Sequence, residues 1–446
     1  MKNSSLAKTL LRLFLLTGSV THLSVEARAN DSERDPASSV IQTPDSTTRS
    51  AQRESAKDVP LEKSADRPRL TGDWNGARTR LADQGLELNF IYKFEYNETL
   101  AGGLNRGAKT LGNFDARAAL DLEKLAGLKG ASVFLYGLGN HGGDPSKNIG
   151  DNQVSSSIET PVDTFRLYEA WFQQLFFDDK ASLLAGLHDL NSEFYATDSS
   201  GLFFNSSFGV GRELSQTGVN GPSIFPVTAP SLRLRAEPSK SCYAQVALFN
   251  GVAGQMGEPH GTHMRVSPDD DGLLQIGEVG YNRVEEEGST ELPVKYAVGA
   301  WSYSKSIDDV SGSKKTLNSG AYLLIDQSIS DYFAIFIRAG LANPDANTVA
   351  SDHQAGIVTQ GLFPGRSEDR AGVAFTTVTF SEPYRQARAR AGNDVLATET
   401  SIELNYRAIL GNGLVIQPDF QYILTPSGST TVPFASVFAV RVEFNF

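Results

Sequence analysis

Arginine, glutamate and tryptophan side chains recur at alternate positions along several extended segments of this chain. Arg233 and Arg235 stand two residues apart, and Glu237 follows at the same spacing. Successive side chains of a β-strand point to opposite faces, so residues two apart share one face. Guanidinium groups donate paired hydrogen bonds to oxygen atoms, and carboxylates accept them. This spacing favours reversible binding of a polar solute along a strand face.

Alternation with apolar residues assigns further side chains to the same kind of face. Arg117, for example, lies between Ala116 and Ala118. The full set of candidate binding residues is Arg117, Glu169, Trp171, Arg233, Arg235, Glu237, Lys295, Trp301, Arg338 and Arg407. The alternative for each charged candidate is that it only solvates a water-filled wall and balances its neighbours.

The segment 164–176 has two polar sets in opposite registers. One register carries Arg166 and Tyr168, and the other carries Glu169 and Trp171. A mid-strand carboxylate in lipid costs a few kcal/mol, whereas an arginine near a strand end can extend to water. We therefore expect Glu169 and Trp171 to face inward and Arg166 to face lipid.

Signals for catalysis and metal binding are weak. The sequence contains neither a Gly-x-Ser-x-Gly elbow nor a P-loop. His260 and His263 precede an aspartate run, 269–271, but such a run often only keeps a loop soluble. We expect no enzyme activity, no cofactor and no metal site.

Strands with two-residue periodicity fill most of the chain. In the last of them, Phe434–Phe446, apolar residues form one face and Arg441 and Glu443 lie on the other. Sixteen strands are predicted, at 86–97, 111–123, 131–139, 164–176, 181–190, 229–237, 243–250, 272–282, 292–304, 319–329, 331–342, 355–363, 371–381, 398–410, 413–424 and 433–446. Ending the chain on an aromatic strand is typical of an outer-membrane β-barrel.

The predicted connections alternate in length. The first connection is long, as are 140–163, 191–228 and 251–271, whereas 177–180 and 411–412 are tight. Bacterial barrels have short periplasmic turns and long extracellular loops. The pattern predicts an all-β, transmembrane antiparallel barrel of about 16 strands, with both termini periplasmic.

The N-terminal region reads as an export signal followed by a linker. Basic residues, a short apolar run and Ala27-Arg28-Ala29 predict a signal peptide at 1–29. Residues 30–69 are polar and charged, so we expect a disordered periplasmic linker, with the barrel domain at 70–446. Without the signal, 36 Lys+Arg stand against 51 Asp+Glu, an acidic balance that argues against nucleic-acid binding. A lone cysteine excludes an internal disulfide framework.

Short motifs in a fixed order make the chain resemble the carbohydrate-selective outer-membrane porin family. They lie at 70–78, 135–143, 166–171, 186–194, 361–366, 402–407 and 417–419. The resemblance covers about Leu70 to Phe446 and leaves out the linker. It implies a sixteen-stranded pore that passes small carbohydrates by diffusion into the periplasm. The expected partners are therefore small sugars, outer-membrane lipid and lipopolysaccharide, and the barrel-assembly machinery, which would recognise Phe446.

In such a pore, function depends on inward-facing side chains and on any long loop that folds inside. The segment 191–228 is the best candidate to narrow the pore, although it could also be a mobile surface loop. The ten candidates would then contact sugar hydroxyls and ring faces, with Arg233, Arg235, Glu169 and Trp171 nearest the narrowest part. The alternative function is a structural or adhesion barrel without selective transport. The sequence leaves monomer and homo-oligomer open.

Overall fold

The computed structural model describes residues 69–258, 264–283, 292–411 and 413–446. The predicted signal peptide lies outside the described residues, as does all of the predicted linker except Arg69. His260 and His263 also lie outside them.

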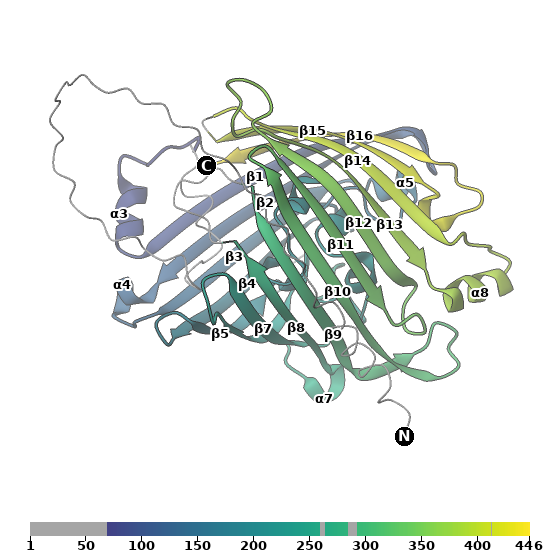
Figure 1. Ribbon diagram of the computed structural model, residues 1–446, viewed down its shortest axis with the longest axis horizontal. Coiled ribbons are helices and arrows are strands. Elements are labelled where there is room, and N and C mark those ends of the chain that lie inside the picture. The colour runs from purple at the N-terminus through teal and green to yellow at the C-terminus, as the bar shows by residue number, and fades with distance from the viewer. Residues whose placement is uncertain (1–68, 259–263, 284–291, 412) are drawn as a thin grey trace, which may run out of the picture. The chain divides into compact units, whose positions relative to one another are not determined.

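Sixteen antiparallel strands form one closed barrel, in which each strand pairs with its sequence neighbours and β1 pairs with β16 (Figure 1). This confirms the predicted fold class. The strands are β1 Leu86–Gly102, β2 Gly107–Asp121, β3 Ala131–Gly142, β4 Thr164–Phe176, β5 Ala181–His188, β6 Ala229–Ala236, β7 Cys242–Asn250, β8 Leu273–Asn282, β9 Val294–Asp308, β10 Lys315–Ser330, β11 Phe333–Ala342, β12 Val349–Gln360, β13 Arg370–Phe380, β14 Thr398–Ile409, β15 Leu414–Leu424 and β16 Ala435–Asn445.

The connections alternate between two ends of the barrel. The turn end carries the start of β1 and the end of β16, together with the short helices α3 (Ala77–Asp83) and α4 (Leu122–Ala126). The loop end carries the longest connections, and its helical segments are α5 Ser146–Ile149, η1 Leu190–Ser192, η2 Ser200–Leu202, η3 Ser206–Phe208, α6 Arg212–Ser215, α7 Pro268–Asp271, α8 Glu382–Arg390 and η4 Pro426–Gly428. Figure 1 shows α3 and α4 at one end and α7 and α8 at the other. Among the described residues, no helix is long and apolar enough to cross a membrane.

Several strand boundaries differ from the prediction, most of all the end of β1 and the start of β12. The first connection is short, because β1 runs on to Gly102 and β2 begins at Gly107. Gly102 makes this tight hairpin feasible: its φ is +69°, and an added Cβ would lie 1.5 Å from the Phe434 carbonyl oxygen. β12 starts at Val349, six residues earlier than expected. Glycines and polar residues hide the alternation at these strand ends.

The outer face of the barrel is apolar and the inner face is polar, as strand alternation requires. In β6, Leu232 and Leu234 are 47% and 51% exposed, whereas Arg233 between them is 1% exposed. Large apolar side chains recur outward on most strands. This pattern suits a lipid-facing outer wall around a polar lumen.

A β-bulge in β4 corrects the predicted face of Arg166. Tyr136 pairs with Glu169 and Gly137 pairs with Leu167, so Tyr168 is the extra residue. The bulge turns both polar sets inward, and Arg166 is 6% exposed rather than lipid-facing. Simple alternation cannot predict a change of face within one strand.

Candidate functional site

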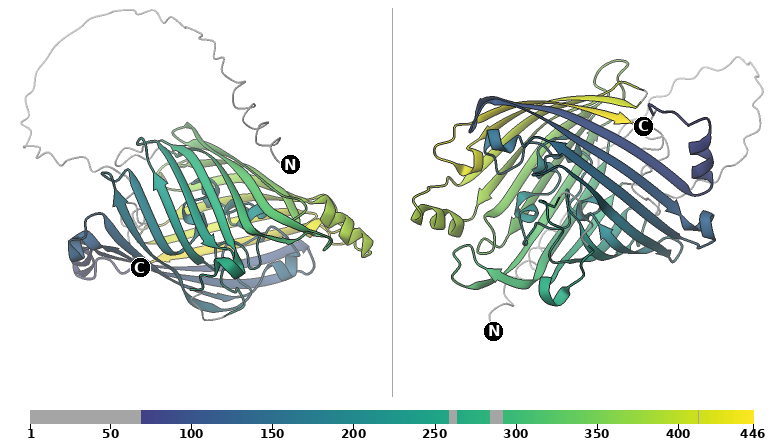
Figure 2. Two further views of the ribbon diagram at one scale, coloured as in Figure 1. Left: turned by 90° about the horizontal axis from the view of Figure 1, so that it is seen from below. Right: turned by 180° about the vertical axis from the view of Figure 1, so that it is seen from behind.

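The β5–β6 connection, residues 189–228, folds into the barrel and is called the inner loop below. Its aromatic residues Phe194, Tyr195, Phe204 and Phe208 are at most 1% exposed. Figure 2 shows the strands wrapping around the short helical segments of this region. The prediction that this loop enters the lumen is confirmed, and the surface-loop alternative is wrong.

Carboxylates of the barrel wall hold the inner loop by its backbone. Glu278 on β8 accepts a hydrogen bond from the Tyr195 N–H at 3.0 Å, and Asp326 on β10 accepts one from Ser199 at 2.9 Å. Asp352 on β12 and Glu403 on β14 accept N–H groups of the same loop. The loop is therefore fixed along several strands.

Arg338 on β11 adds donors to this set of contacts. Its guanidinium donates to the carbonyl oxygens of Tyr195 at 2.9 Å and Gly209 at 2.7 Å, and to the Ser200 hydroxyl at 2.9 Å. The side chain is 1% exposed. This candidate faces inward, as its strand position predicts, but the inner loop covers it.

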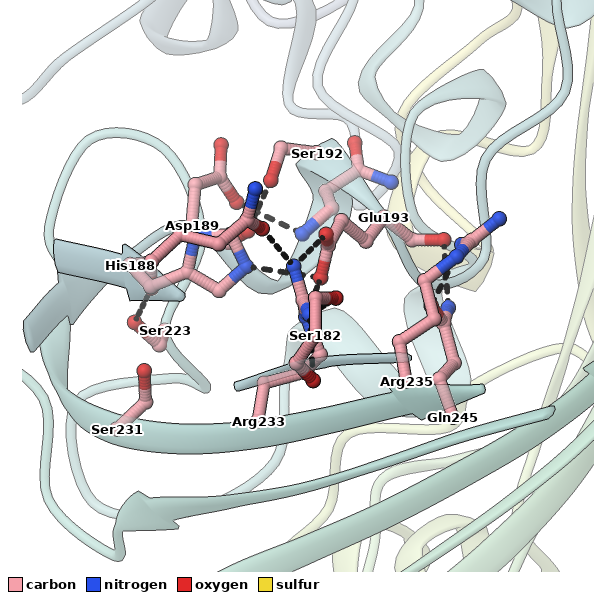
Figure 3. Close-up of polar contacts among 12 residues, drawn as sticks. Ser182, His188, Asp189, Ser192, Glu193, Ser223, Ser231, Arg233, Arg235 and Gln245 are labelled. Atoms are coloured by element: carbon pink, nitrogen blue, oxygen red, sulfur yellow. Dashed lines mark hydrogen bonds and ion pairs between the residues drawn. The ribbon is translucent and has the colours of Figure 1, made fainter. Parts of the chain in front are cut away.

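The start of the inner loop is tied to the wall by a buried charged cluster (Figure 3). Glu193 accepts two hydrogen bonds from Arg233, at 2.7 and 2.6 Å, and its Oε2 is 3.3 Å from His188 Nε2. The other ring nitrogen of His188 is 3.2 Å from Glu169, which also accepts the Asp189 N–H. Burial alone would raise the pKa of Glu193, but the Arg233 and His188 charges outweigh it and lower that pKa well below its usual range.

The structure places the two candidate arginines of β6, Arg233 and Arg235, in different environments. Arg233 is buried, and it also donates to Ser182 and Gln173. Arg235 remains partly exposed in the lumen, bonded to Glu237 at 2.8 Å and to Gln245 at 2.9 Å. Arg235 is thus available to a solute, whereas Arg233 holds the inner loop.

The two predicted tryptophans pack into the wall rather than into open lumen. Trp171 is 4% exposed and lies 5.1 Å from Phe134 between ring centroids. Trp301 is 3% exposed and crosses Gly320, where an added Cβ would lie 2.5 Å from the indole. Both face inward, but neither indole face is open to a ligand.

The remaining predicted cations are partly exposed and ion-paired. Arg117 lies 3.3 Å from Asp115, Lys295 lies 3.6 Å from Glu278, and Arg407 lies 3.2 Å from Glu443. Their side chains retain 17–23% exposure. These three side chains, with Arg235 and Glu237, are the candidates that line accessible lumen.

A polar cavity of about 380 Å³ lies on the turn-end side of the inner loop. It is lined by Thr197, Asp198, Gly201, Leu202, Arg370, Arg407, Gln417 and Glu443. Arg370 on β13 lies 2.9 Å from Asp198 of the inner loop, so wall and loop both contribute charged groups. Of these residues only Arg407 is among the sequence candidates. Arg370 falls one residue outside a predicted strand, and no sequence signal places Asp198.

A closed sixteen-stranded barrel with a loop folded into its lumen defines an outer-membrane channel of the porin class. The chain belongs to the family described as carbohydrate-selective porin, OprB family, whose model matches residues 105–446. This match confirms the resemblance to that family seen in the short sequence motifs.

Relatives support the same fold. The chain is 24% identical over 427 residues to Porin B of Pseudomonas aeruginosa, covering 84% of this chain and 91% of that protein. The high-pH structure of Pseudomonas putida OprB superposes with a TM-score of 0.75 at 23% identity, covering 85% of this chain and 99% of that one. The low-pH structure gives a TM-score of 0.55 at 19% identity, covering 85% and 98%.

Proposed function

We propose that this protein is a passive, substrate-selective channel for small carbohydrates, with its turn end facing the periplasm. The observation that carries the proposal is the 380 Å³ cavity beneath the inner loop, which presents donors and acceptors together. Specific small-molecule sites have about 300–1,000 Å³ of space and a few well-placed polar groups. A sugar presents hydroxyls that both donate and accept, so it matches such a lining.

The proposed binding step exchanges ion pairs for hydroxyl contacts. Arg370 and Arg407 would donate to sugar oxygens, and Asp198 and Glu443 would accept from sugar hydroxyls. Because each guanidinium already has a carboxylate partner, a neutral hydroxyl can share the pair without leaving a charge uncompensated. Transit requires release as well as binding, so we expect dissociation constants on the order of 1 mM.

An inner loop that stays in one position, and so leaves a constant opening through the lumen, suits diffusion. The inner loop is held by carboxylates from β8, β10, β12 and β14, so its position would persist while solutes pass. Selection would then come from aperture size and the cavity lining rather than from a conformational cycle. The apolar outer face would contact lipid and lipopolysaccharide, and Phe446 would serve recognition by the assembly machinery.

Liposome swelling tests the proposal. Purified protein in vesicles should admit mono- and disaccharides faster than uncharged solutes of similar size that carry fewer hydroxyls. Equal rates at equal size would contradict selectivity, and no swelling with any sugar would favour the structural or adhesion alternative. Empty vesicles and vesicles with a general porin are the controls.

A further inference from the structure

The β3–β4 loop, residues 143–163, is a second connection that reaches the inner face of the barrel wall. Glu399 on β14 accepts the backbone N–H groups of Asn152 and Gln153, each at 2.7 Å. Gln153 is 0% exposed. A wall carboxylate therefore holds this loop by its backbone, in the same way as other wall carboxylates hold the inner loop.

Two backbone hydrogen bonds join the β3–β4 loop to the inner loop. Ser157 donates its N–H to the Phe204 carbonyl oxygen at 2.7 Å, and Ser206 donates its N–H to the Val154 carbonyl oxygen at 2.9 Å. The two segments thus run side by side in opposite directions, as the strands of a short antiparallel pair do. A displacement of one segment would therefore displace the other.

Gln153 connects both segments with the wall. Its amide oxygen accepts hydrogen bonds from Ser207 of the inner loop at 3.2 Å and from Thr376 of β13 at 2.6 Å. Its amide nitrogen donates to the Glu399 carbonyl oxygen at 3.1 Å, and its backbone carbonyl oxygen accepts from Asn205 of the inner loop at 2.7 Å. Gln153 therefore bonds to two wall strands and to the inner loop.

The inner-loop residues that Gln153 contacts adjoin the polar cavity. Leu202 lines the cavity and lies three residues before Asn205, and Gln417 of the cavity wall donates to the Leu202 carbonyl oxygen at 2.8 Å. Leu202 and Phe208, on either side of Asn205, belong to one buried apolar cluster, so this segment packs as a unit. A shift of the segment would therefore change the position of Leu202 in the cavity lining.

We propose that Gln153 is a positioning residue for the sugar cavity. By joining the β3–β4 loop, the inner loop and the wall, it fixes the part of the cavity that the inner loop supplies. This inference rests on the proposed carbohydrate-channel function and adds to it a residue outside the cavity lining. A lining that is already ordered binds more tightly, because binding then need not order it. Loss of the Gln153 contacts should weaken sugar binding without removing any group that touches the sugar.

Sugar titration of single-channel current tests this role. Gln153→Met keeps nearly the same side-chain volume and removes the side-chain hydrogen bonds, so it should raise the sugar dissociation constant about three- to tenfold. The conductance without sugar should change far less, because Asp326 and Glu403 still hold the inner loop. Thr160→Val is the matched control: it removes a hydrogen bond within the β3–β4 loop, to the Val162 carbonyl oxygen, and should leave the dissociation constant unchanged.

Ser207→Ala is a second and milder variant, since it removes only one donor to Gln153. It should also raise the sugar dissociation constant. Its effect should not add to that of Gln153→Met, because Gln153→Met already removes the same hydrogen bond. Should Gln153→Met not fold, the result for Ser207→Ala decides.

Melting temperatures of the same variants separate positioning from simple stabilisation. A lower melting temperature with unchanged sugar dissociation constants in Gln153→Met and Ser207→Ala would overturn this inference, as would an equal rise of the dissociation constant in Thr160→Val. Either result would leave the proposed function intact. Failure of every sugar to reduce the wild-type current would instead overturn the proposed function itself.

Discussion

Glu193 of the inner loop and Arg233 of β6 form a two-point ion pair, with nitrogen–oxygen distances of 2.7 and 2.6 Å. Glu193 lies five residues after the end of β5, where the chain turns from the wall into the lumen. It therefore fixes the direction in which the inner loop leaves the barrel wall.

We predict that Arg233→Ala lowers the free energy of unfolding of the barrel far more than Arg235→Ala does. Loss of Arg233 leaves Glu193, whose side chain is 20% exposed, without its main partner. Breaking a fully buried pair this way costs about 3–5 kcal/mol, so partial solvation of Glu193 should bring the cost here to about 3 kcal/mol or less. Arg235 and Glu237 are both partly exposed, so the second substitution should cost about 1 kcal/mol or less. Urea unfolding in detergent measures the difference, and equal losses would contradict these roles.

Arg233→Ala and Arg235→Ala should also differ in their single-channel currents. Arg235→Ala removes a lumen-facing side chain, so it should raise ion conductance and lower the preference for sugars while leaving the current steady. Arg233→Ala should instead give a noisy current, because the inner loop loses its anchor. Single-channel recording distinguishes these results; two steady, identical channels would be the contrary outcome.

The Glu193 anchor should resist acid. Its pKa is lowered from the usual 4.5 by Arg233 and His188, despite the opposing effect of burial. A lowered pKa means that the ion pair contributes fully above about pH 4.5 and is lost only as pH falls through the lower folded value. Current noise should stay constant from pH 8 to pH 5 and rise only at more acidic pH. A rise between pH 8 and pH 6 would argue against this anchor.

Glu159, in the β3–β4 loop, should contribute to stability with the opposite pH dependence from Glu193. Burial, then a hydrogen bond with Asp144, raises its pKa from 4.5 to about 10. Its contribution to stability is complete below about pH 4.5 and is lost as pH rises toward 10. Glu159→Gln should therefore melt at a higher temperature than wild type at pH 9 and at nearly the same temperature at pH 4. Identical melting at both pH values would refute this assignment.

The barrel seam should depend on Arg78. This side chain donates to the Phe446 carbonyl oxygen at 3.0 Å and to that of Leu88 at 3.4 Å, with Trp74 beneath it at 4.1 Å. Arg78→Ala should cost about 1–3 kcal/mol, since two part-buried acceptors lose a charged donor. Heat-modified migration on gels measures seam stability, with Arg80→Ala, on the exposed side of α3, as the control.

Much of the fold was predictable because each strand buries one face and exposes the other to lipid. Sixteen strands and the inward position of Arg117, Arg235, Arg338 and Arg407 follow from that alternation. The β4 bulge could not be predicted, because one inserted residue reverses the faces without altering composition. Nor does strand position show which inward residues another segment will cover.

The division of labour within the lumen depends on tertiary contacts. Arg233 and Arg235 are equivalent in sequence spacing, yet only Arg233 meets Glu193. The Arg370–Asp198 pair joins segments 172 residues apart, which local periodicity does not relate. The placement of the inner loop depends on hydrogen bonds from its backbone N–H groups to wall carboxylates, and every residue type except proline has that group.

Sugar titration of single-channel current, with and without a filled cavity, tests the central claim most directly. An added Cβ at Gly201 has no heavy atom within 4 Å, so Gly201→Trp should fill the cavity without disturbing the backbone. Gly257, equally open on a loop-end segment away from the cavity, provides the control variant Gly257→Trp. Sugar at millimolar concentrations should reduce the current of wild type and the control, and it should have no effect on Gly201→Trp. Equal reduction in all three channels would contradict the assignment of the sugar site to this cavity.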